Sequence, residues 1–332
     1  MLKVIDTTLR DGSHAVSHSF TAEQVRDISR VLDQAGVDII EISHGDGLAG
    51  SSINYGFSKT NELELIKAAS EVVKNAKIGV LLLPGIGTIA DLDKAYDAGA
   101  RVVRIATHVT EADVAIEHIK HAKEKGMFIV GFLMMIHMAS PEKIVEQAKI
   151  FEENGVDYIN LADSAGHLTQ NEVKERIEAV KLSCNVPVGF HAHNNLGLAV
   201  ANSITAIESG AKYIDATCCG LGAGAGNCQL EVLSAVLNRL NIENNLDFKK
   251  LLEASEKHVR PLLQRPQIID AAALMLGYSG VYSSFLLHAK RAAEIYNLSV
   301  IDILEELGKR KMVGGQEDMI IDVAYHLANK KE

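Results

Sequence analysis

The stretch GVDYINL at residues 155–161 decides the fold, because the same pattern occurs three more times along the chain. The other copies are GVDIIEI (36–42), GARVVRI (99–105) and GAKYIDA (210–216). In each copy, a glycine suited to the end of a helix precedes two turn residues and an apolar run typical of a buried strand. Repetition of one helix-to-strand joint predicts a chain built from successive βα units.

Eight apolar runs follow one another along the first 250 residues, and a helix-like amphipathic segment comes after each. The runs lie at 3–8, 38–43, 77–83, 102–107, 127–135, 158–163, 188–193 and 213–218. Many of the segments between them open on Thr or Ser, which cap helices, and several close on Gly. This order predicts a (β/α)₈ TIM barrel over residues 1–250. An open, doubly wound sheet is the alternative, but no GxGxxG motif follows the first run.

The alternation of strand and helix patterns stops near residue 250. Residues 251–332 keep helical periodicity and contain no convincing strand, so we predict a helical extension or small second domain there. Within it, GYSGVYSSF (277–285) is rich in Gly, Ser and Tyr, which indicates a loop between helices.

Composition narrows the class of protein. The formal net charge of −10 argues against nucleic acid or an anionic membrane surface as a partner. No apolar run approaches the 18 residues of a membrane span, and the N-terminus lacks the pattern of a signal peptide. The four cysteines show no CxxC spacing, which is typical of reduced thiols. We therefore expect a cytoplasmic protein.

Functional residues of TIM barrels gather where the strands end, and the predicted strand ends are crowded with polar side chains. The crowd comprises Asp6, Arg10, Asp11, His14, Glu41, His44, Asp46, Arg104, His108, His137, Asn160, Asp163, Ser164, His191, His193 and Asp215. Their concentration predicts an active site at the C-terminal mouth of the barrel.

HAHNNLG (191–197) is the sharpest motif in this crowd. His191 and His193 are two residues apart in a predicted strand, so their side chains point to the same side. Two imidazoles and one carboxylate from a neighbouring strand would suit Mn²⁺, Mg²⁺, Co²⁺ or Zn²⁺ and leave positions for substrate. The alternative is a pair of buried histidines with ordinary hydrogen-bond partners.

TLRDGSH (8–14) follows the first predicted strand and supplies complementary groups. Asp11 could be the third metal ligand, Arg10 a fixed cation, and His14 a base. The alternative is a surface Arg–Asp pair at a turn. Within the strand runs, the only lysines are Lys3 and Lys77 at the strand starts, the wrong end for a Schiff-base nucleophile, so carbonyl chemistry would need a metal as Lewis acid.

GLGAGAGNCQLE (220–231) opens the segment after the eighth predicted strand. A glycine-rich backbone at the start of a helix can cradle an anion, but the stretch lacks the Lys-Ser or Lys-Thr of a nucleotide-binding P-loop. The alternative is a flexible loop that packs closely over the mouth.

Several of these motifs together resemble a known superfamily. DTTLRDG (6–12), HAHNNLG and GAGN (224–227) are similar to metal-dependent barrels such as hydroxymethylglutaryl-CoA lyase, isopropylmalate synthase and the pyruvate carboxyltransferases. More narrowly, HGDGLAGSSINYGF (44–57), GYSGVYSSFL (277–286) and MVGGQEDMI (312–320) resemble the 4-hydroxy-2-oxovalerate aldolase family. This resemblance runs nearly end to end, through the helical extension.

The resemblance implies retro-aldol cleavage of 4-hydroxy-2-oxopentanoate to pyruvate and acetaldehyde. Asp11, His191 and His193 then match the ligands of a divalent metal, usually Mn²⁺, with Co²⁺ or Mg²⁺ as alternatives. Arg10 matches the residue that stabilises the enolate of pyruvate. His14 matches the base that takes the proton of the C4 hydroxyl.

The remaining positions implied by the resemblance concern substrate and partner. Tyr282 would orient the substrate, the backbone at Ser164 would contact its carboxylate, and Leu81 and Leu83 would line the pocket for the aldehyde end. Asn227 is expected near the metal rather than on it. The partner would be an acylating acetaldehyde dehydrogenase in a hetero-oligomer, docked on the extension and receiving the aldehyde through a channel.

Two other functions remain open at this point. A Claisen-type acyl-CoA enzyme of the same superfamily would use the same metal with a different second substrate. An inactive barrel kept only as a partner subunit would have lost Arg10, Asp11 or His14, and all three are present.

Overall fold

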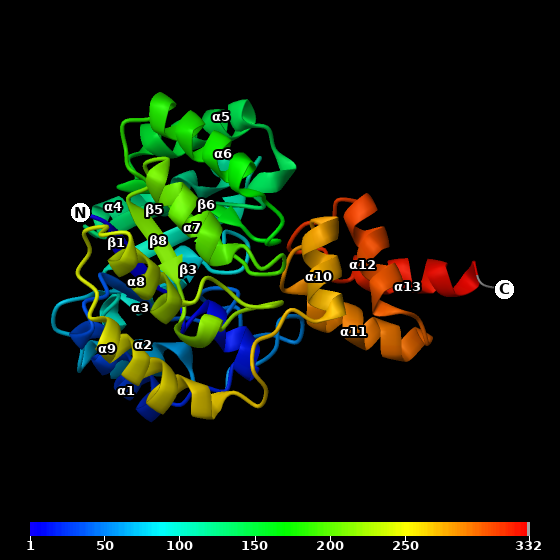
Figure 1. Cartoon of the computed structure of the whole chain (residues 1–332), viewed down its shortest axis with the longest axis horizontal. Coiled ribbons are helices and arrows are strands. Elements are labelled where there is room, and N and C mark those ends of the chain that lie inside the picture. Colours follow the sequence, from blue (N-terminus) through cyan, green and yellow to red (C-terminus); the bar gives the residue numbers. More distant parts are fainter. Residues whose placement is uncertain (331–332) are drawn as a thin grey trace.

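The computed structural model describes residues 1–330, and in that range eight parallel strands close into a barrel in which β8 returns to pair with β1. The strands are β1 (Lys3–Asp6), β2 (Ile39–Glu41), β3 (Lys77–Leu82), β4 (Val102–His108), β5 (Phe128–Met134), β6 (Tyr158–Asp163), β7 (Val188–Ala192) and β8 (Tyr213–Ala216). Each lies within one of the eight apolar runs, except that β4 extends one residue further, to His108. The prediction of a TIM barrel is therefore confirmed (Figure 1).

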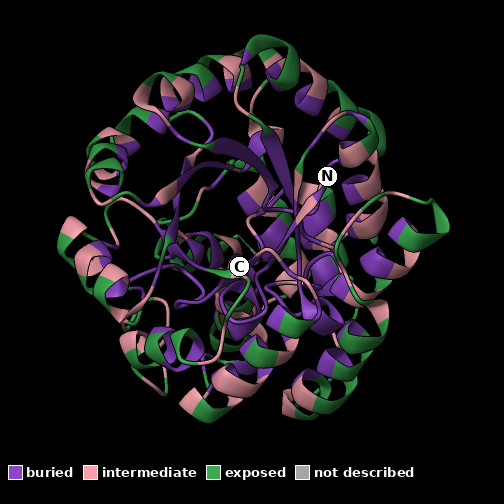
Figure 2. Ribbon diagram, turned by 90° about the vertical axis from the view of Figure 1, so that its left-hand side faces the viewer, coloured by how far each residue is buried: buried purple, intermediate pink, exposed green. Residues whose placement is uncertain are grey.

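Helices on the outside of the barrel cover the strands and leave the buried strands in the middle (Figure 2). They are α1 (Ala22–Gln34), α2 (Glu62–Ser70), α3 (Ile89–Ala98), α4 (Ile116–Glu124), α5 (Pro141–Asn154), α6 (Gln170–Ser183), α7 (Ala199–Glu208), α8 (Leu230–Arg239) and α9 (Phe248–Glu253). Thr21, Thr88 and Ser140 accept backbone N–H bonds at the starts of α1, α3 and α5. These side chains satisfy donors that the first helical turn leaves free.

Side chains inside the barrel change from apolar to charged along the strands. Ile39 and Val102 belong to a buried apolar layer at the floor of the barrel, toward the strand starts. Residues two positions apart in a strand share a face, so Glu41 and Arg104 point into the same interior, nearer the mouth. The chain thus builds an apolar floor under a charged mouth.

The extension lies beside the mouth of the barrel (Figure 1). It consists of α10 (Ala271–Ser279), α11 (Phe285–Tyr296), α12 (Val300–Lys309) and α13 (Met319–Asn329), with an apolar cluster of its own. Leu251 and Val259 still belong to the apolar cluster of the barrel. Within the extension, the second apolar cluster begins at Ala272. The predicted extension ran to residue 332, and residues 331–332 lie outside the described range.

The loop predicted at 277–285 is shorter in the structure, because its first three residues finish α10 and Phe285 begins α11. Gly280 ends α10 in the left-handed conformation (φ +66°), and the next N–H, of Val281, donates to the carbonyl of Leu276. Gly277 lies inside α10, where a side chain would not fit because an added Cβ would lie 2.8 Å from Cβ of Asn195. This glycine therefore permits close packing rather than a turn.

Across residues 1–330, no helix combines the length and the apolar character that a bilayer span requires.

Candidate active site

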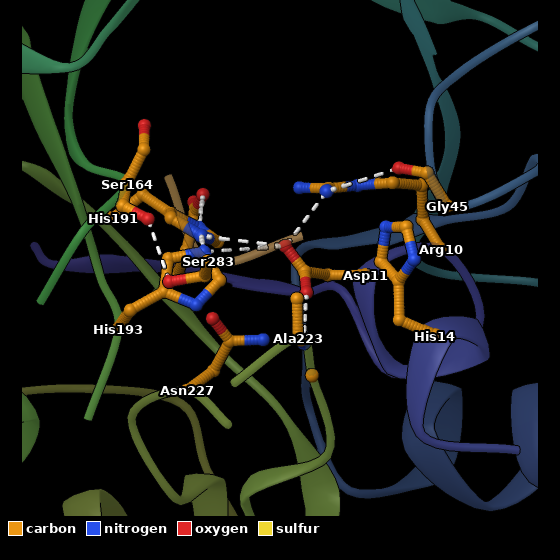
Figure 3. Close-up of polar contacts among 12 residues, drawn as sticks. Arg10, Asp11, His14, Gly45, Ser164, His191, His193, Ala223, Asn227 and Ser283 are labelled. Carbon is orange, nitrogen blue, oxygen red and sulfur yellow. Dashed lines mark hydrogen bonds and ion pairs between the residues drawn. The ribbon is translucent and has the colours of Figure 1, made fainter. Parts of the chain in front are cut away.

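Three side chains from β1 and β7 converge at the mouth of the barrel. Asp11 begins a short 3₁₀ turn, Asp11–Val16, shortly after β1, while His191 lies in β7 and His193 directly follows it. Oδ2 of Asp11 is 3.6 Å from Nε2 of His191 and 3.7 Å from Nε2 of His193, and the two Nε2 atoms are 3.4 Å apart. The structure thus brings the three predicted ligands together in a buried group that could hold a metal ion (Figure 3).

The donor atoms of this trio fit a divalent cation. A point equidistant from the three atoms lies about 2.1 Å from each, close to the bonds of roughly 2.0–2.2 Å that such ions form with imidazole nitrogen and carboxylate oxygen. Nδ1 of His191 donates to Oδ2 of Asp215 at 2.8 Å, which leaves Nε2 to bind a metal. Asn227 lies beside the trio, and its buried Oδ1 finds no hydrogen-bond donor within residues 1–330. An unpartnered acceptor here suits a site meant for an ion or water.

The protonation states of Asp11 and His193 also suit a cation. Burial opposes the charge of Asp11, but Arg10 and the two histidines outweigh it and hold its pKa well below the ordinary value. Burial lowers the pKa of His193 to about 4, so its imidazole is neutral. Burial likewise opposes the charged form of His191, but hydrogen bonds to Asp11 and Asp215 raise its pKa. Cation binding, which displaces a proton, would favour the neutral ring of His191.

A buried chain of alternating charges connects Arg10 to the metal group. Nε of Arg10 donates to Oε2 of Glu41 at 2.7 Å, and the same oxygen accepts from Nη1 of Arg104 at 3.1 Å. Arg104 also pairs with Asp215, which in turn accepts from His191. Strand-end polarity had placed Glu41, Arg104 and Asp215 at the mouth without assigning them roles. The sequence signal for these three residues was a charged side chain two positions beyond an inward-facing apolar residue of the same strand.

Arg10 points its guanidinium toward the same carboxylate that faces the histidines. Its Nη1 donates to Oδ2 of Asp11 at 2.8 Å and lies 3.5 Å from the carbonyl of Gly45. The predicted alternative of a surface Arg–Asp pair is wrong, because the two side chains are only 6% and 5% exposed. The pair is a buried part of the mouth.

His14 lies in the same 3₁₀ turn as Asp11, with its ring against the backbone of Gly45. A Cβ on Gly45 would lie 2.5 Å from Nε2 of His14, so only glycine leaves room for the ring. The same Nε2 is 4.0 Å from Oδ2 of Asp46, a nearly buried carboxylate that sequence reasoning left without a role. Beyond His14, the rings of His18 and His44 stack at 3.8 Å, and burial lowers their pKa values to about 2 and about 4.

Tyr282 reaches the mouth because its loop is attached to the barrel by the next residue. Ser283 donates twice to the carbonyl of Ser164, from its backbone N at 3.1 Å and from its hydroxyl at 2.7 Å. The Tyr282 ring lies against Gly314, where an added Cβ would come within 3.2 Å of it. Because a carbonyl oxygen only accepts hydrogen bonds, any contact of the Ser164 backbone with an anion must come from its N–H.

One cavity of about 290 Å³ joins several of the predicted positions. Tyr282, Leu83 and Asp46 line it, together with apolar side chains after β3, β4 and β5. Leu81 lies one layer deeper, in the apolar layer that includes Phe132. His14 borders two adjoining cavities and meets this one through its neighbour Asp46.

The glycine-rich segment after β8 packs over the metal group. The N–H of Ala223 donates to Oδ1 of Asp11 at 3.2 Å. A side chain at Gly222 would come within 3.0 Å of that same oxygen and would overlap Asn227. The segment thus packs against Asp11 and donates a hydrogen bond to one of the three predicted ligands.

The fold and the site place this protein in the class of (β/α)₈ barrels that carry a buried Asp–His–His group at the C-terminal mouth. The sequence profile of the HMGL-like family matches residues 1–257, and that of the DmpG-like communication domain matches residues 267–329. A relative from Moorella thermoacetica is 60% identical over 330 residues, 99% of this chain and 98% of its own length. One from Carboxydothermus hydrogenoformans is 60% identical over 332 residues, 99% of both chains. Both are named 4-hydroxy-2-oxovalerate aldolase, and this chain belongs to the 4-hydroxy-2-oxovalerate aldolase family within the HMGL-like barrels.

Solved structures agree with the fold. The N-terminal domain of a putative aldolase from Bacteroides vulgatus aligns with a TM-score of 0.75 at 28% identity, covering 89% of this chain and 98% of that one. The carboxyl transferase domain of pyruvate carboxylase from Rhizobium etli aligns with a TM-score of 0.83 at 15% identity, covering 99% and 60%. The second likeness concerns the fold alone.

Proposed function

We propose that this protein is a divalent-metal-dependent aldolase that cleaves 4-hydroxy-2-oxopentanoate into pyruvate and acetaldehyde. The observation that carries the proposal is the buried Asp–His–His group, with a fixed cation, Arg10, bonded to Asp11 and a base, His14, in the same short segment (Figure 3). The names of the relatives at 60% identity support the same reaction.

Asp11, His191 and His193 would hold the cation, Mn²⁺ by preference with Co²⁺ or Mg²⁺ as substitutes, and it would supply Lewis acidity at the 2-oxo group. One carboxylate oxygen and two imidazole nitrogens leave coordination positions free for a substrate that offers oxygen ligands.

The residues around this group divide the reaction between them. His14 takes the proton of the C4 hydroxyl, the C3–C4 bond breaks, and its electrons pass to the oxygen on C2 as an enolate. The guanidinium of Arg10, fixed by Glu41 and Asp11, stabilises the negative charge on that oxygen. Delivery of one proton to C3 of the enolate, which balances the proton taken by His14, then completes pyruvate and restores the base. Oδ2 of Asp46 lies 4.0 Å from Nε2 of His14, so this carboxylate faces the ring of the proposed base.

The cavity lined by Leu83 and Tyr282 would receive the aldehyde end of the substrate. Its walls are mostly apolar, which suits a methyl group, while the Tyr282 hydroxyl orients the C4 oxygen. Leu81 supports Leu83 from the layer below. The N–H of Ser164 would bind the carboxylate of the oxo acid, where a backbone donor matches an anion.

The extension would dock an acylating acetaldehyde dehydrogenase in a hetero-oligomer and pass the aldehyde to it. Its match to a DmpG-like communication domain supports this role. So do apolar side chains that it leaves exposed, among them Leu274, Tyr278, Ile295, Ile321 and Tyr325. On this proposal, residues 1–250 are the catalytic unit and residues 251–332 the docking unit. Four free, buried cysteines favour a reducing cytoplasm.

An assay that couples pyruvate release to lactate dehydrogenase tests the proposal directly. We expect 4-hydroxy-2-oxopentanoate to yield pyruvate in the presence of Mn²⁺ and turnover to stop after exhaustive chelation. Homologues of increasing chain length would report on the aldehyde cavity. Release of a thiol from acyl-CoA substrates without pyruvate formation would instead identify a Claisen-type enzyme.

A further inference from the structure

Asn195, two residues beyond His193, is a fully buried amide that joins three separate segments. Its Nδ2 donates to the carbonyl of Ala165 at 2.8 Å and to the hydroxyl of Ser283 at 2.9 Å. Its Oδ1 accepts the N–H of Ala225 at 2.8 Å. One side chain thus ties together the turn after β6, the loop before α11 and the glycine-rich segment after β8.

Each of these segments carries a group of the proposed active site within two residues of the one that Asn195 holds. Ala165 follows Ser164, and Ser283 follows Tyr282 and donates to the Ser164 carbonyl. The glycine-rich segment supplies the N–H of Ala223 to Asp11. Asn195 therefore forms hydrogen bonds to residues that lie close to three parts of the proposed site: the carboxylate-binding backbone, the orienting tyrosine and the N–H that contacts a proposed metal ligand.

The surroundings of Asn195 leave its side chain no alternative position. A Cβ at Gly224 would lie 2.5 Å from its Oδ1, and a Cβ at Gly277 would lie 2.8 Å from its Cβ. Glycines of the barrel segment and of the extension thus close on it from two directions. Only an amide of this length offers two donated bonds and one accepted bond in this space.

We propose that Asn195 is a positioning residue that sets Tyr282 of the extension against the substrate-binding backbone at Ser164. The inference rests on the proposed aldolase function. Loss of the amide would loosen the substrate-binding geometry without removing a metal ligand. Steady-state constants for the oxo acid should therefore change while metal affinity does not.

Asn195→Ala in the full-length enzyme tests this directly. Loss of all three side-chain hydrogen bonds, two donated and one accepted, predicts a rise in KM and a fall in kcat that together lower kcat/KM for 4-hydroxy-2-oxopentanoate by about 10- to 100-fold. Affinity for Mn²⁺, followed by its electron paramagnetic resonance signal, should stay within about twofold of wild type. Asn195→Asp keeps the accepted bond but loses both donors, so its kcat/KM should not recover.

Asn202→Ala is the matched control. Asn202 is also a buried amide that donates from Nδ2 to a backbone carbonyl, that of Leu168, at 2.8 Å. We expect this variant to lose stability and keep the wild-type kcat/KM. An equal loss of kcat/KM in both variants would reduce Asn195 to an ordinary structural residue and overturn the proposal.

Ser283→Ala supplies a second route should Asn195→Ala not fold. It removes one Asn195 bond together with one bond to Ser164, and we expect kcat/KM to fall by about tenfold. In the double variant the two losses should combine to less than their product, because both act through one contact. Wild-type kcat/KM in Ser283→Ala, or independent effects in the cycle, would overturn the positioning role. A wild-type enzyme without pyruvate release would instead overturn the aldolase function and this inference with it.

Discussion

The floor and the mouth of the barrel use the same strands for opposite purposes. At the floor, Ile39 of β2 and Val102 of β4 pack in a dry apolar layer. Two residues nearer the mouth on the same strands, Glu41 and Arg104 form an ion pair that is fully buried. Removal of a methyl group from the floor leaves a cavity, whereas removal of one charge from the mouth leaves its partner unpaired.

The difference shows where stability and function are separable in this chain. Charges at the mouth are held by one another, from Arg10 through Glu41, Arg104 and Asp215 to His191. Each member therefore fixes the next, and a change far from the metal group reaches it through paired side chains. The floor has no comparable connection within residues 1–330, so its variants should act on stability alone.

Asp11→Ala should produce the largest effect, because it removes a metal ligand and the partner of Arg10 together. We expect kcat to fall by about 10³-fold or more and bound Mn²⁺ to be lost, as measured by pyruvate release and by metal content. Asp27→Ala, at an exposed position of α1, should match wild type. Full activity of the Asp11 variant would exclude this carboxylate as a ligand.

Arg104→Met and Ile39→Ala compare mouth and floor directly. The first leaves Glu41 and Asp215 buried without their shared cation, which predicts a loss of about 3–5 kcal/mol in the free energy of unfolding. It should also weaken Mn²⁺ binding by about 10- to 100-fold through His191. Ile39→Ala should lose about 2–5 kcal/mol by leaving a cavity, with unchanged metal affinity. Equal metal affinities in the two variants would contradict the comparison.

His14→Ala should lower kcat by about 10²-fold while Mn²⁺ stays bound, because a base is lost and the ligands remain. Metal content and turnover measured on one preparation separate the two effects. His121→Ala on the outer helix α4 serves as the control. Undiminished turnover would remove His14 from the role of base.

Asp6→Asn should have the smallest effect, and that effect should depend on pH. Burial, which outweighs two hydrogen bonds from Thr8, raises the pKa of Asp6 from 3.8 to about 7. A raised pKa means that the stability contributed by this carboxyl is present below pH 4 and is lost as the pH rises through 7. The neutral amide should therefore gain about 1–3 kcal/mol above pH 7 and little at pH 4. Denaturant titrations at both pH values check this, and an equal gain at both would contradict it.

Strand positions and the metal trio could be predicted from sequence because both follow from local rules. Glycine before an apolar run marked four of the strands, and parallel strands of a barrel all end at one mouth. His191, His193 and Asp11 were therefore expected at the same mouth once the strand count was known. The identities of the three side chains then indicated a cation.

The buried charge chain and the links of Asn195 could not be predicted in the same way. Which inward side chains meet across the barrel depends on the stagger between strands, and no local pattern pairs Arg104 with Asp215. Asn195 finds Ser283 in the extension, 88 positions along the chain. The end of α10 was predicted too early for a related reason. Gly277 is required by close packing against Asn195 and does not mark a turn in its own segment.

The position of the N-terminus, just before the first strand, determines where a tag or a surface can be attached to the enzyme. Its N-terminus emerges at the floor, on the side of the barrel away from the extension, and Met1 is 61% exposed (Figure 1). A purification tag or a surface attachment at this end would point away from both the mouth and the proposed docking helices. Molecules immobilised through Met1 would therefore have their active sites directed toward solution. The helices proposed to dock a dehydrogenase would be accessible to it there.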